Sequence, residues 1–285
     1  MDSSRMLTNI TAPRQEPNVT ARCASMYRET AVSQRWNTAR IEAMYRNEWK
    51  YYISLWEGEM LKRRLLPFME LDPHAENGQY TIRSLYFDDY WDSAYTEKLM
   101  GVADRKKWRV RIYNYSDAGI RLERKKKKNS YIFKESAPLS RQEFEWILEG
   151  KYEFLLQSRY NLCREFYYEC MVNLQRPKVV VDYERTPLIR REGDVRVTFD
   201  RDVRAAAFNY NIFDPQLPTR AMLDPDMMVL EVKFTELLPS VIQELLPLDG
   251  QQFSAISKYT LCYEAAFFRT DMMAGISKTN RRKNR

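Results

Sequence analysis

The stretch KWRVRIYNY at residues 107–115 alternates cationic and apolar side chains with a period of two. Successive side chains of a β-strand point to opposite faces, so Arg109 and Arg111 share one face while Val110 lies on the other. A charged face opposite an apolar face predicts a strand that packs against a hydrophobic core on one side only.

The same alternation recurs along most of the chain and predicts about eight strands. The other segments are RNEWKYYI (46–53), YTIRSLYF (80–87), GIRLERKKK (119–127), SYIFK (130–134), KVVVDYE (178–184), DVRVTFD (194–200) and MVLEVKF (228–234).

Helix signals lie between these segments. Ser54 with Glu57, and Ser140 with Glu143, each match the capping box that opens a helix. Further helices are predicted at 92–100, 152–174, 239–246 and 254–268. Together the elements predict a strand-rich α+β domain with helices packed outside the sheet.

The charged faces of the strands are rich in arginine and lysine, with single carboxylates among them. They carry Arg46, Glu48 and Lys50; Arg121, Glu123, Lys125 and Lys127; Arg196, Thr198 and Asp200; and Glu231 and Lys233. For any one strand, a solvated outer face is the simpler explanation. Several such strands around one axis predict instead a closed antiparallel β-barrel, a tunnel whose cationic interior binds a chain of phosphates.

Composition limits the chemistry of such a site. The 46 Lys and Arg exceed the 39 Asp and Glu, which favours anionic partners. His74 is the only histidine, so a metal would be held by oxygen atoms, as Mg²⁺ and Mn²⁺ are. The four widely spaced cysteines, Cys23, Cys163, Cys170 and Cys262, are predicted to be reduced packing residues.

One folded domain is predicted at residues 44–270. Residues 1–43 lack periodicity and are predicted to be a flexible extension, and residues 271–285 a basic disordered tail. Apolar runs are too short for a membrane span and the N-terminus lacks a secretory signal, so the predicted location is the cytoplasm.

The segments NEWKYYI, SLYFDD, KWRVRIYNY, LERKKKK, ERTPLIRREGDVRVTFD, MVLEVKF and SAISKY, in this order, resemble the VTC (vacuolar transporter chaperone) domain. This family is a branch of the CYTH-like triphosphate tunnel metalloenzymes. The resemblance spans about residues 45–265, and an ordered series of motifs is more specific than any one of them.

The resemblance implies a tunnel-forming antiparallel barrel in which the γ-phosphate of ATP is transferred to a growing inorganic polyphosphate chain, assisted by Mn²⁺ or Mg²⁺. Tri- and pyrophosphate are the implied ligands besides ATP and polyphosphate. It assigns catalytic roles to Lys50, Arg109, Arg111, Lys125 and Glu231, with Glu231 as the metal ligand. The predicted substrate-binding set is Arg46, Glu48, Arg83, Glu123, Lys134, Arg185, Arg196, Lys233 and Lys258.

Two positions depart from the wider pattern. Many tunnel triphosphatases begin with ExExK, whereas this chain has Arg46, Glu48 and Lys50, so the first carboxylate has become a cation. This favours the VTC branch over a plain triphosphatase. After Lys134 come Glu135 and Ser136, where many relatives are more basic.

The leading hypothesis is therefore an ATP-dependent polyphosphate polymerase. An inorganic triphosphatase or NTP hydrolase of the same fold and a non-catalytic polyphosphate-binding module remain as alternatives. Nucleic acid is not an expected partner, because the aromatic residues occupy the apolar phase of strands and helices. The primer, product length, preferred metal, oligomeric state and any membrane partner are left open by the sequence.

Overall fold

The computed structural model describes residues 46–129, 131–235, 237–246 and 256–267. The extension predicted at residues 1–43, the tail predicted at 271–285 and Cys23 lie outside the described residues. Cys163, Cys170 and Cys262 are free and buried, which confirms their prediction as packing residues.

The described residues form an antiparallel sheet with helices on both faces, which is an α+β fold. The long strands are β1 (Arg46–Ser54), β3 (Tyr80–Asp88), β4 (Asp104–Tyr113), β5 (Arg121–Lys128), β6 (Tyr131–Pro138), β7 (Arg176–Arg190), β8 (Val195–Ala206) and β10 (Met227–Thr235). The two short strands β2 (Glu70–Leu71) and β9 (Arg220–Ala221) pair with β7 and β8 and were not predicted.

The helices are α2 (Leu55–Leu65), α3 (Ser93–Leu99), α4 (Arg141–Leu148), α5 (Asn161–Val172), α6 (Ser240–Leu245) and α7 (Lys258–Phe267), with 3-10 turns η1 (Glu76–Gly78), η2 (Glu153–Gln157) and η3 (Glu192–Asp194). Both predicted capping boxes are present, at the starts of α2 and α4. The single helix predicted at 152–174 is wrong: η2 and α5 replace it, because the Ser158 hydroxyl accepts a hydrogen bond from the Tyr160 amide and so favours a turn.

The strand order is β1-β10-β8-β7-β3-β4-β5-β6, with β1 and β6 at the two ends. The predicted closed barrel is therefore wrong: among the described strands no backbone ladder joins β6 to β1. Instead, Lys125 on β5 reaches Glu48 on β1, with Nζ 3.0 Å from Oε2. Long charged side chains thus occupy the space between the two ends, and a salt bridge spans it where a ladder would have closed the sheet.

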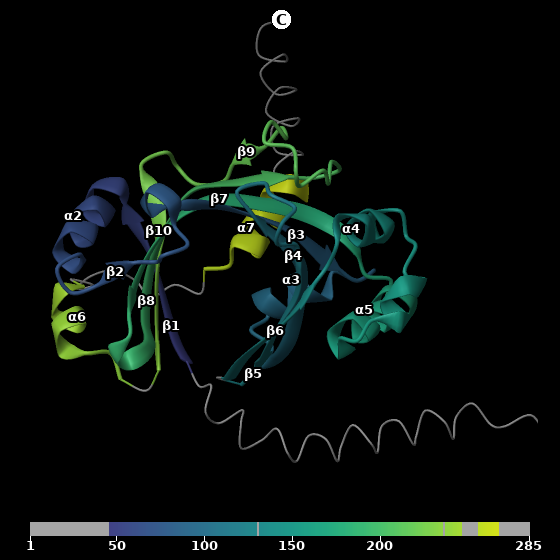
Figure 1. The fold of residues 1–285 in the computed structure, drawn as a ribbon, viewed down its shortest axis with the longest axis horizontal. Coiled ribbons are helices and arrows are strands. Elements are labelled where there is room, and N and C mark those ends of the chain that lie inside the picture. Colours follow the sequence, from purple (N-terminus) through teal and green to yellow (C-terminus); the bar gives the residue numbers. More distant parts are fainter. Residues whose placement is uncertain (1–45, 130, 236, 247–255, 268–285) are drawn as a thin grey trace, which may run out of the picture. The chain divides into compact units, whose positions relative to one another are not determined.

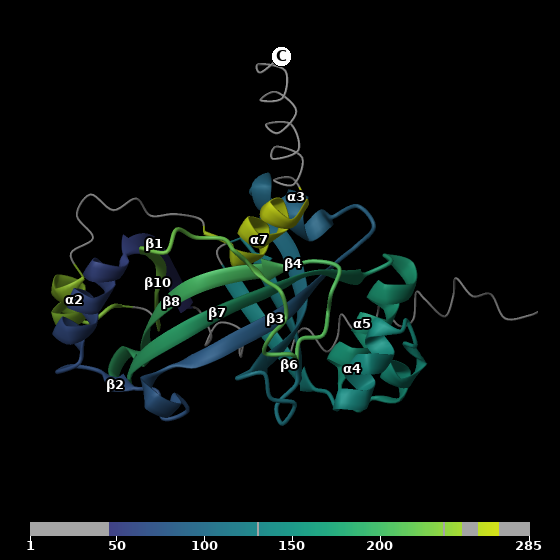
Figure 2. The same ribbon diagram turned by 90° about the horizontal axis from the view of Figure 1, so that it is seen from above.

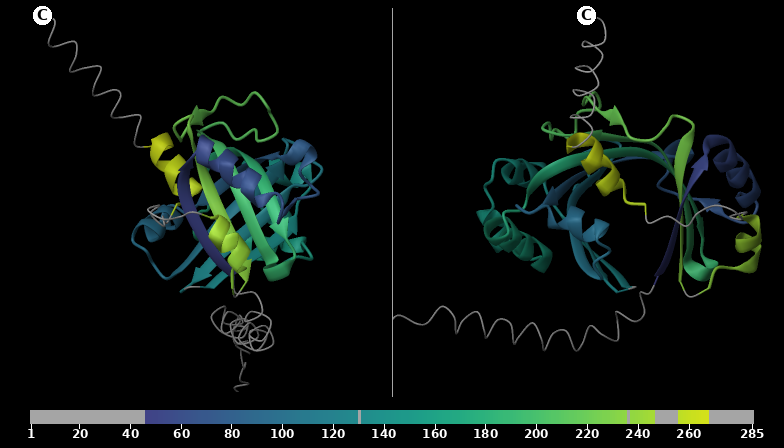
Figure 3. Two further views of the ribbon diagram at one scale, coloured as in Figure 1. Left: turned by 90° about the vertical axis from the view of Figure 1, so that its left-hand side faces the viewer. Right: turned by 180° about the vertical axis from the view of Figure 1, so that it is seen from behind.

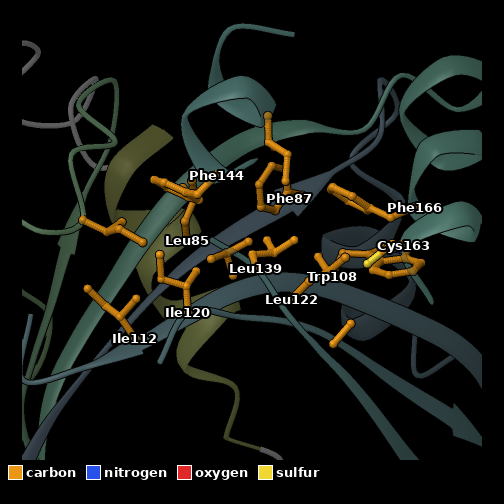
Figure 4. Packing of buried hydrophobic residues seen from close by; sticks show 14 of the residues in the cluster. Leu85, Phe87, Trp108, Ile112, Ile120, Leu122, Leu139, Phe144, Cys163 and Phe166 are labelled. Atoms are coloured by element: carbon orange, nitrogen blue, oxygen red, sulfur yellow. The ribbon is translucent and has the colours of Figure 1, made fainter. Parts of the chain in front are cut away.

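The sheet is strongly curved, and most of its helices lie on its convex side (Figures 1 and 3). There α4 and α5 cover β3 to β6, and Trp108, Leu122, Phe144 and Phe166 are among the side chains of this core (Figure 4). At the other end α2 and α6 cover the apolar face of β1, β10 and β8. Packing in these two cores turns the apolar side chains of the strands to the convex side. The alternate side chains of the same strands therefore face the concave side.

Helix α7 lies under the concave side of the sheet, close to β7 and β8 (Figures 1 and 2). Its Tyr259 and Cys262 pack with Tyr86, Val181 and Val203 of the sheet. Tyr86 pairs directly with Arg109, so this apolar patch and the predicted arginines belong to the same face. The concave face is thus apolar beneath α7 and charged elsewhere.

None of the helices in the described part of the chain has the length and apolar composition that a membrane span requires.

Candidate functional site

Glu123 on β5 gathers cations from its two neighbouring strands, β4 and β6, on the concave face. Arg109, its cross-strand partner on β4, places Nε 2.8 Å and Nη2 2.7 Å from Oε2. Lys134 Nζ on β6 lies 2.6 Å from Oε1, and Arg111 Nη1 lies 3.9 Å from Oε2. Burial alone would raise the pKa of Glu123, but these three cations outweigh it and lower the pKa to about 2. Glu123 is therefore ionised at neutral pH and fixes the two arginines.

Hydroxyl groups on neighbouring strands hold the same arginines from the other side. Arg109 Nη1 donates to the Tyr86 hydroxyl at 2.9 Å, and Arg111 Nε donates to Ser84 Oγ at 3.1 Å. Because each guanidinium has five donors, part of each fork stays available for an anion. Two adjacent, oriented guanidinium groups are well suited to bind successive phosphate groups.

A second cluster joins β1 and β10, where Lys50 faces Glu231 and Glu48 faces Lys233 across the ladder. Lys50 Nζ lies 3.1 Å from Glu48 and 3.4 Å from Glu231, and Lys233 Nζ lies 3.1 Å from Glu231. Burial opposes ionisation, but Lys233 and Lys50 hold the pKa of Glu231 well below its usual range. Burial likewise opposes the charge of Lys50, but Glu231 and Glu48 raise its pKa. The pKa of Glu48 is lowered as well, so Glu48, Glu231 and Lys50 are charged at neutral pH.

Asp200 is the centre of a third cluster and links α7 to the sheet. Arg185 on β7 contacts it through both edges of the guanidinium, Nε to Oδ1 at 2.6 Å and Nη2 to Oδ2 at 2.7 Å. Lys258, the first residue of α7, places Nζ 2.5 Å from Oδ2. Arg185 Nη2 also lies 3.3 Å from Glu231 Oε2, so this cluster continues into the one on β10.

Most of the predicted site residues are thus brought together on one face. These are Glu48, Lys50, Arg109, Arg111, Glu123, Lys125, Lys134, Arg185, Glu231, Lys233 and Lys258. Even with Asp200 included, the cations outnumber the carboxylates. A buried or half-buried excess of positive charge is costly unless an anion compensates it.

Three predicted residues do not join this set as described. Arg83 lies on the convex phase of β3, is 1% exposed, and pairs with Asp182 at 2.7 Å. Arg196 stays on the concave phase but is bound by Asp72 and the Tyr80 hydroxyl, each at 2.8 Å. Arg46 pairs with Thr235 in the β1–β10 ladder, and its side chain lies outside the described residues.

Sequence reasoning missed Asp200 and Lys107 as site residues. Both lie in the charged phase of segments that were recognised as strands, so alternation placed them on the right face. Asp200 was overlooked because its role is to orient Arg185 and Lys258, which depends on contacts between distant segments. Lys107 was overlooked because it precedes the strongest part of the RVR pattern, although it continues the same face.

A divalent metal fits only part of this donor set. The carboxyl groups of Glu48 and Glu231 both contact the Lys50 ammonium, at 3.1 and 3.4 Å. No group of three or more His, Cys, Asp or Glu side chains forms a metal site within the described ranges. Mg²⁺ and Mn²⁺ are commonly held by one or two carboxylates together with substrate phosphates. Glu231 and Glu48 fit that role, with phosphate oxygens as the remaining ligands.

Comparison with solved structures finds distant likenesses in fold. A protein from Hippeastrum described as an adenylyl cyclase with dominant triphosphatase activity is 16% identical; the match covers 78% of this chain and 96% of that one, with a TM-score of 0.48. An adenylate cyclase-like protein from Bacillus halodurans is 12% identical over 75% of this chain and 95% of that one, with a TM-score of 0.42. Among curated proteins, none matches the sequence.

The family comparison covers a similar share of the chain and identifies a named family. The model of the VTC domain matches residues 45–267, which begins just before β1 and ends with α7. The match therefore includes every strand of the sheet and all the charged clusters described above. This chain belongs to the VTC domain family.

Proposed function

We propose that this protein is an ATP-dependent polyphosphate polymerase that works on the concave face of its sheet. The observation that carries the proposal is the excess of oriented cations there, each held by a carboxylate and directed to one face. Glu123 orients Arg109 and Arg111, and Asp200 orients Arg185 and Lys258. Such an arrangement suits a ligand with many closely spaced negative charges, as ATP and polyphosphate have.

In the proposed reaction a terminal oxygen of the polyphosphate chain attacks the γ-phosphorus of ATP. The bond from that phosphorus to the β–γ bridging oxygen breaks, and ADP leaves with the bonding electrons. Because donor and acceptor are both phosphates, the protein contributes alignment and charge compensation, which is how phosphoryl transfer is generally catalysed. Arg109 and Arg111 would align the triphosphate, and Lys50 and Lys258 would bind the phosphates beside it.

Glu231 and Glu48 would hold the divalent metal with the help of phosphate oxygens. When bound there, Mn²⁺ or Mg²⁺ would neutralise charge on the phosphates during transfer. Lys50 and Lys233 contact the same carboxylate, that of Glu231, at 3.4 and 3.1 Å. These lysines would also contact the phosphates that share the metal.

The residue at the start of the first strand, Arg46, favours a polymerase over a hydrolase. A triphosphatase pattern has a carboxylate at the position of Arg46, and replacing it by a cation shifts the balance toward binding a longer polyanion. The experiment is direct: the purified full chain is incubated with ATP and Mn²⁺ or Mg²⁺, with and without a short polyphosphate primer, and the products are separated by size.

Each outcome of this experiment identifies a different function. ADP formed in step with a growing polymer supports the proposal. Orthophosphate without polymer would instead identify a triphosphatase or NTP hydrolase. Tight, salt-sensitive polyphosphate binding with no turnover in either metal would identify a non-catalytic binding module.

A further inference from the structure

One end of the concave face carries cations that form no ion pair with a described carboxylate. Lys98, Arg105, Lys107 and Lys127 have no carboxylate within 4 Å among the residues that the structure describes, whereas Lys50, Lys125 and Arg109 each have at least one. Arg105 and Lys127 are direct partners in the β4–β5 ladder, and Lys107 is the partner of Lys125. The unbalanced cations are therefore continuous with the site on the same face.

Helix α3 adds the fourth member of this group. The charge of Lys98 acts on Lys107, and the charges of Arg105, Lys50 and Lys127 act on Lys98 in turn. Burial and these like charges lower the pKa of Lys98. Four cations from α3, β4 and β5 thus converge without an ion-paired carboxylate. Asp88, whose charge also acts on Lys107, already accepts a hydrogen bond from the Tyr259 hydroxyl. Such a group of cations binds an anion favourably.

Lys107 is held in place by neutral groups. Its Nζ donates to Ser257 Oγ at 3.1 Å and lies 4.7 Å from the centre of the Tyr259 ring. The Tyr259 hydroxyl donates to Asp88 Oδ2 at 2.5 Å, which fixes the ring. The amine is therefore oriented at the border between the apolar patch beneath α7 and the charged part of the face.

We propose that Lys98, Arg105, Lys107 and Lys127 form a second phosphate-binding site, which holds the part of a polyphosphate chain that extends beyond the carboxylate-paired cations. The proposal rests on the proposed function, because it takes the ligand to be a phosphate chain. These four residues are called the second phosphate site. Lys107 is the direct partner of Lys125 of the first site, and the pair of Arg105 and Lys127 lies two residue pairs further along the same ladder.

Occupation of the second phosphate site should be coupled to a proton. Burial, followed by the charges of Lys98, Arg105 and Lys125, lowers the pKa of Lys107 to about 7. The groups that face it are Lys98 on α3, Arg105 on β4, Lys125 on β5, Asp88 on β3, and Ser257 and Tyr259 at the start of α7. A phosphate anion favours the charged amine and so raises this pKa on binding.

The direction of the pH effect follows from linkage. The bound complex holds more protons than the free protein near pH 7, so affinity falls as pH rises. If only charged Lys107 contributes to binding, the affinity falls about tenfold between pH 6 and pH 8, the range in which a group with a pKa of about 7 loses most of its proton.

The test is calorimetric titration of the metal-free full chain with a long linear polyphosphate, whose internal phosphates do not titrate near pH 7. Wild type is compared with Lys107→Met and Lys107→Arg, in buffers of different ionisation enthalpy. Lys106→Met is the matched control, because Lys106 is the preceding residue of β4, lies on the opposite face and pairs with Glu169. Circular dichroism and thermal melting verify the fold of each variant.

We expect wild type and Lys106→Met to take up protons on binding and to bind more weakly at pH 8 than at pH 6. Lys107→Met should lose proton uptake and bind about as weakly at pH 6 as wild type does at pH 8. Lys107→Arg, which keeps its charge, should bind tightly at both pH values. A merely structural role for Lys107 would not give opposite results for these two variants.

Two failures have distinct meanings. If Lys107→Met and Lys107→Arg kept the proton uptake and pH dependence of wild type, the second phosphate site would be refuted while polyphosphate binding, and with it the proposed function, would stand. If wild type bound no polyphosphate at any pH, the proposed function itself would fall.

Discussion

Lys50 Nζ on β1 lies 3.4 Å from Glu231 Oε1 directly across the β1–β10 ladder. The same ladder pairs Glu48 with Lys233, so the two strands present alternating charges in a compact square. A shift of β1 by one residue against β10 would move Lys50 and Glu48 to the convex face and leave Glu231 and Lys233 behind. The apolar core beneath α2 and α6 resists that shift, so packing on one face of the strands determines the position of the charged site on the other.

Glu231→Gln should abolish metal-dependent turnover and leave polyphosphate binding largely intact. The amide keeps the size of the side chain but removes the charge that Lys50, Lys233 and Arg185 surround. Loss of one such electrostatic group commonly costs on the order of 10²–10³ in kcat. Polymer formation and polyphosphate binding, measured on the same preparation, separate the two effects.

Glu184→Gln is the matched control for that experiment. Glu184 lies on β7, near Arg185 in the sequence, and is 30% exposed with Arg201 as its partner. Its loss should change neither turnover nor binding by more than about twofold, as is usual for exposed ion pairs, which contribute about 0–1 kcal/mol. Normal turnover in Glu231→Gln would show that the metal is held elsewhere.

Arg109→Ala should lose turnover while the protein stays folded. The truncation removes a fork that the proposed function places on the triphosphate, yet Glu123 keeps Lys134 at 2.6 Å and is not left unpaired. Turnover and the thermal midpoint are measured side by side. Near-normal turnover would refute the site, and loss of the fold would show that Arg109 acts mainly in stability.

The sequence was sufficient to predict the faces of the strands, because alternation with period two is a local property. The RVR pattern of β4 placed Arg109 and Arg111 on the charged side, and both capping boxes marked the correct helix starts. Closure of the sheet was not predictable in the same way. Closure depends on how β1 and β6, the two end strands of the sheet, approach each other. Near these ends Lys125 and Glu48 interact through side chains and not through a backbone ladder.

The ion-pair partners of individual charged residues could not be predicted from the sequence either. Arg83 looks equivalent to Arg109 in an alternating strand, but it belongs to the opposite phase and pairs with Asp182, which lies 99 residues further along the chain. Asp200 gains its role only when β7 and α7 bring Arg185 and Lys258 to it. Such contacts between distant segments leave no local pattern to read.

Arg83→Ala should therefore unfold the protein more easily without removing a site residue. Arg83 bonds Asp182 and the carbonyl oxygens of Ile212 and Asp214, and its removal leaves the buried Asp182 carboxylate with only the more distant Arg204, 3.8 Å away. Breaking such a buried pair costs about 3–5 kcal/mol. Urea denaturation measures the loss, and turnover per folded molecule should stay within about twofold of wild type. A large loss of turnover at unchanged stability would place Arg83 in the site.

The stability that Glu123 provides should disappear in acid. Its pKa in the folded protein is lowered from 4.5 to about 2, so the carboxylate stabilises the fold fully above about pH 4.5 and loses that contribution as pH falls toward 2. At one pKa unit per 1.36 kcal/mol, the contribution is on the order of 3 kcal/mol. Glu123→Gln should lower the free energy of unfolding by roughly that amount at pH 7, and the difference from wild type should shrink steadily below pH 4.5.

Urea midpoints at a series of pH values measure this difference, with Glu145→Gln as the control. Glu145 is 44% exposed and pairs with Arg141 on the surface of α4, so its replacement should cost less than about 1 kcal/mol. A Glu123→Gln difference that stayed constant down to pH 3 would mean that side-chain packing, and not charge, is lost in the variant. If the difference in free energy of unfolding between wild type and Glu123→Gln vanishes in acid, the ionised Glu123 carboxylate stabilises the fold. The same carboxylate orients Arg109 and Arg111, so one ionised group then accounts for both the stability and the orientation of the arginines.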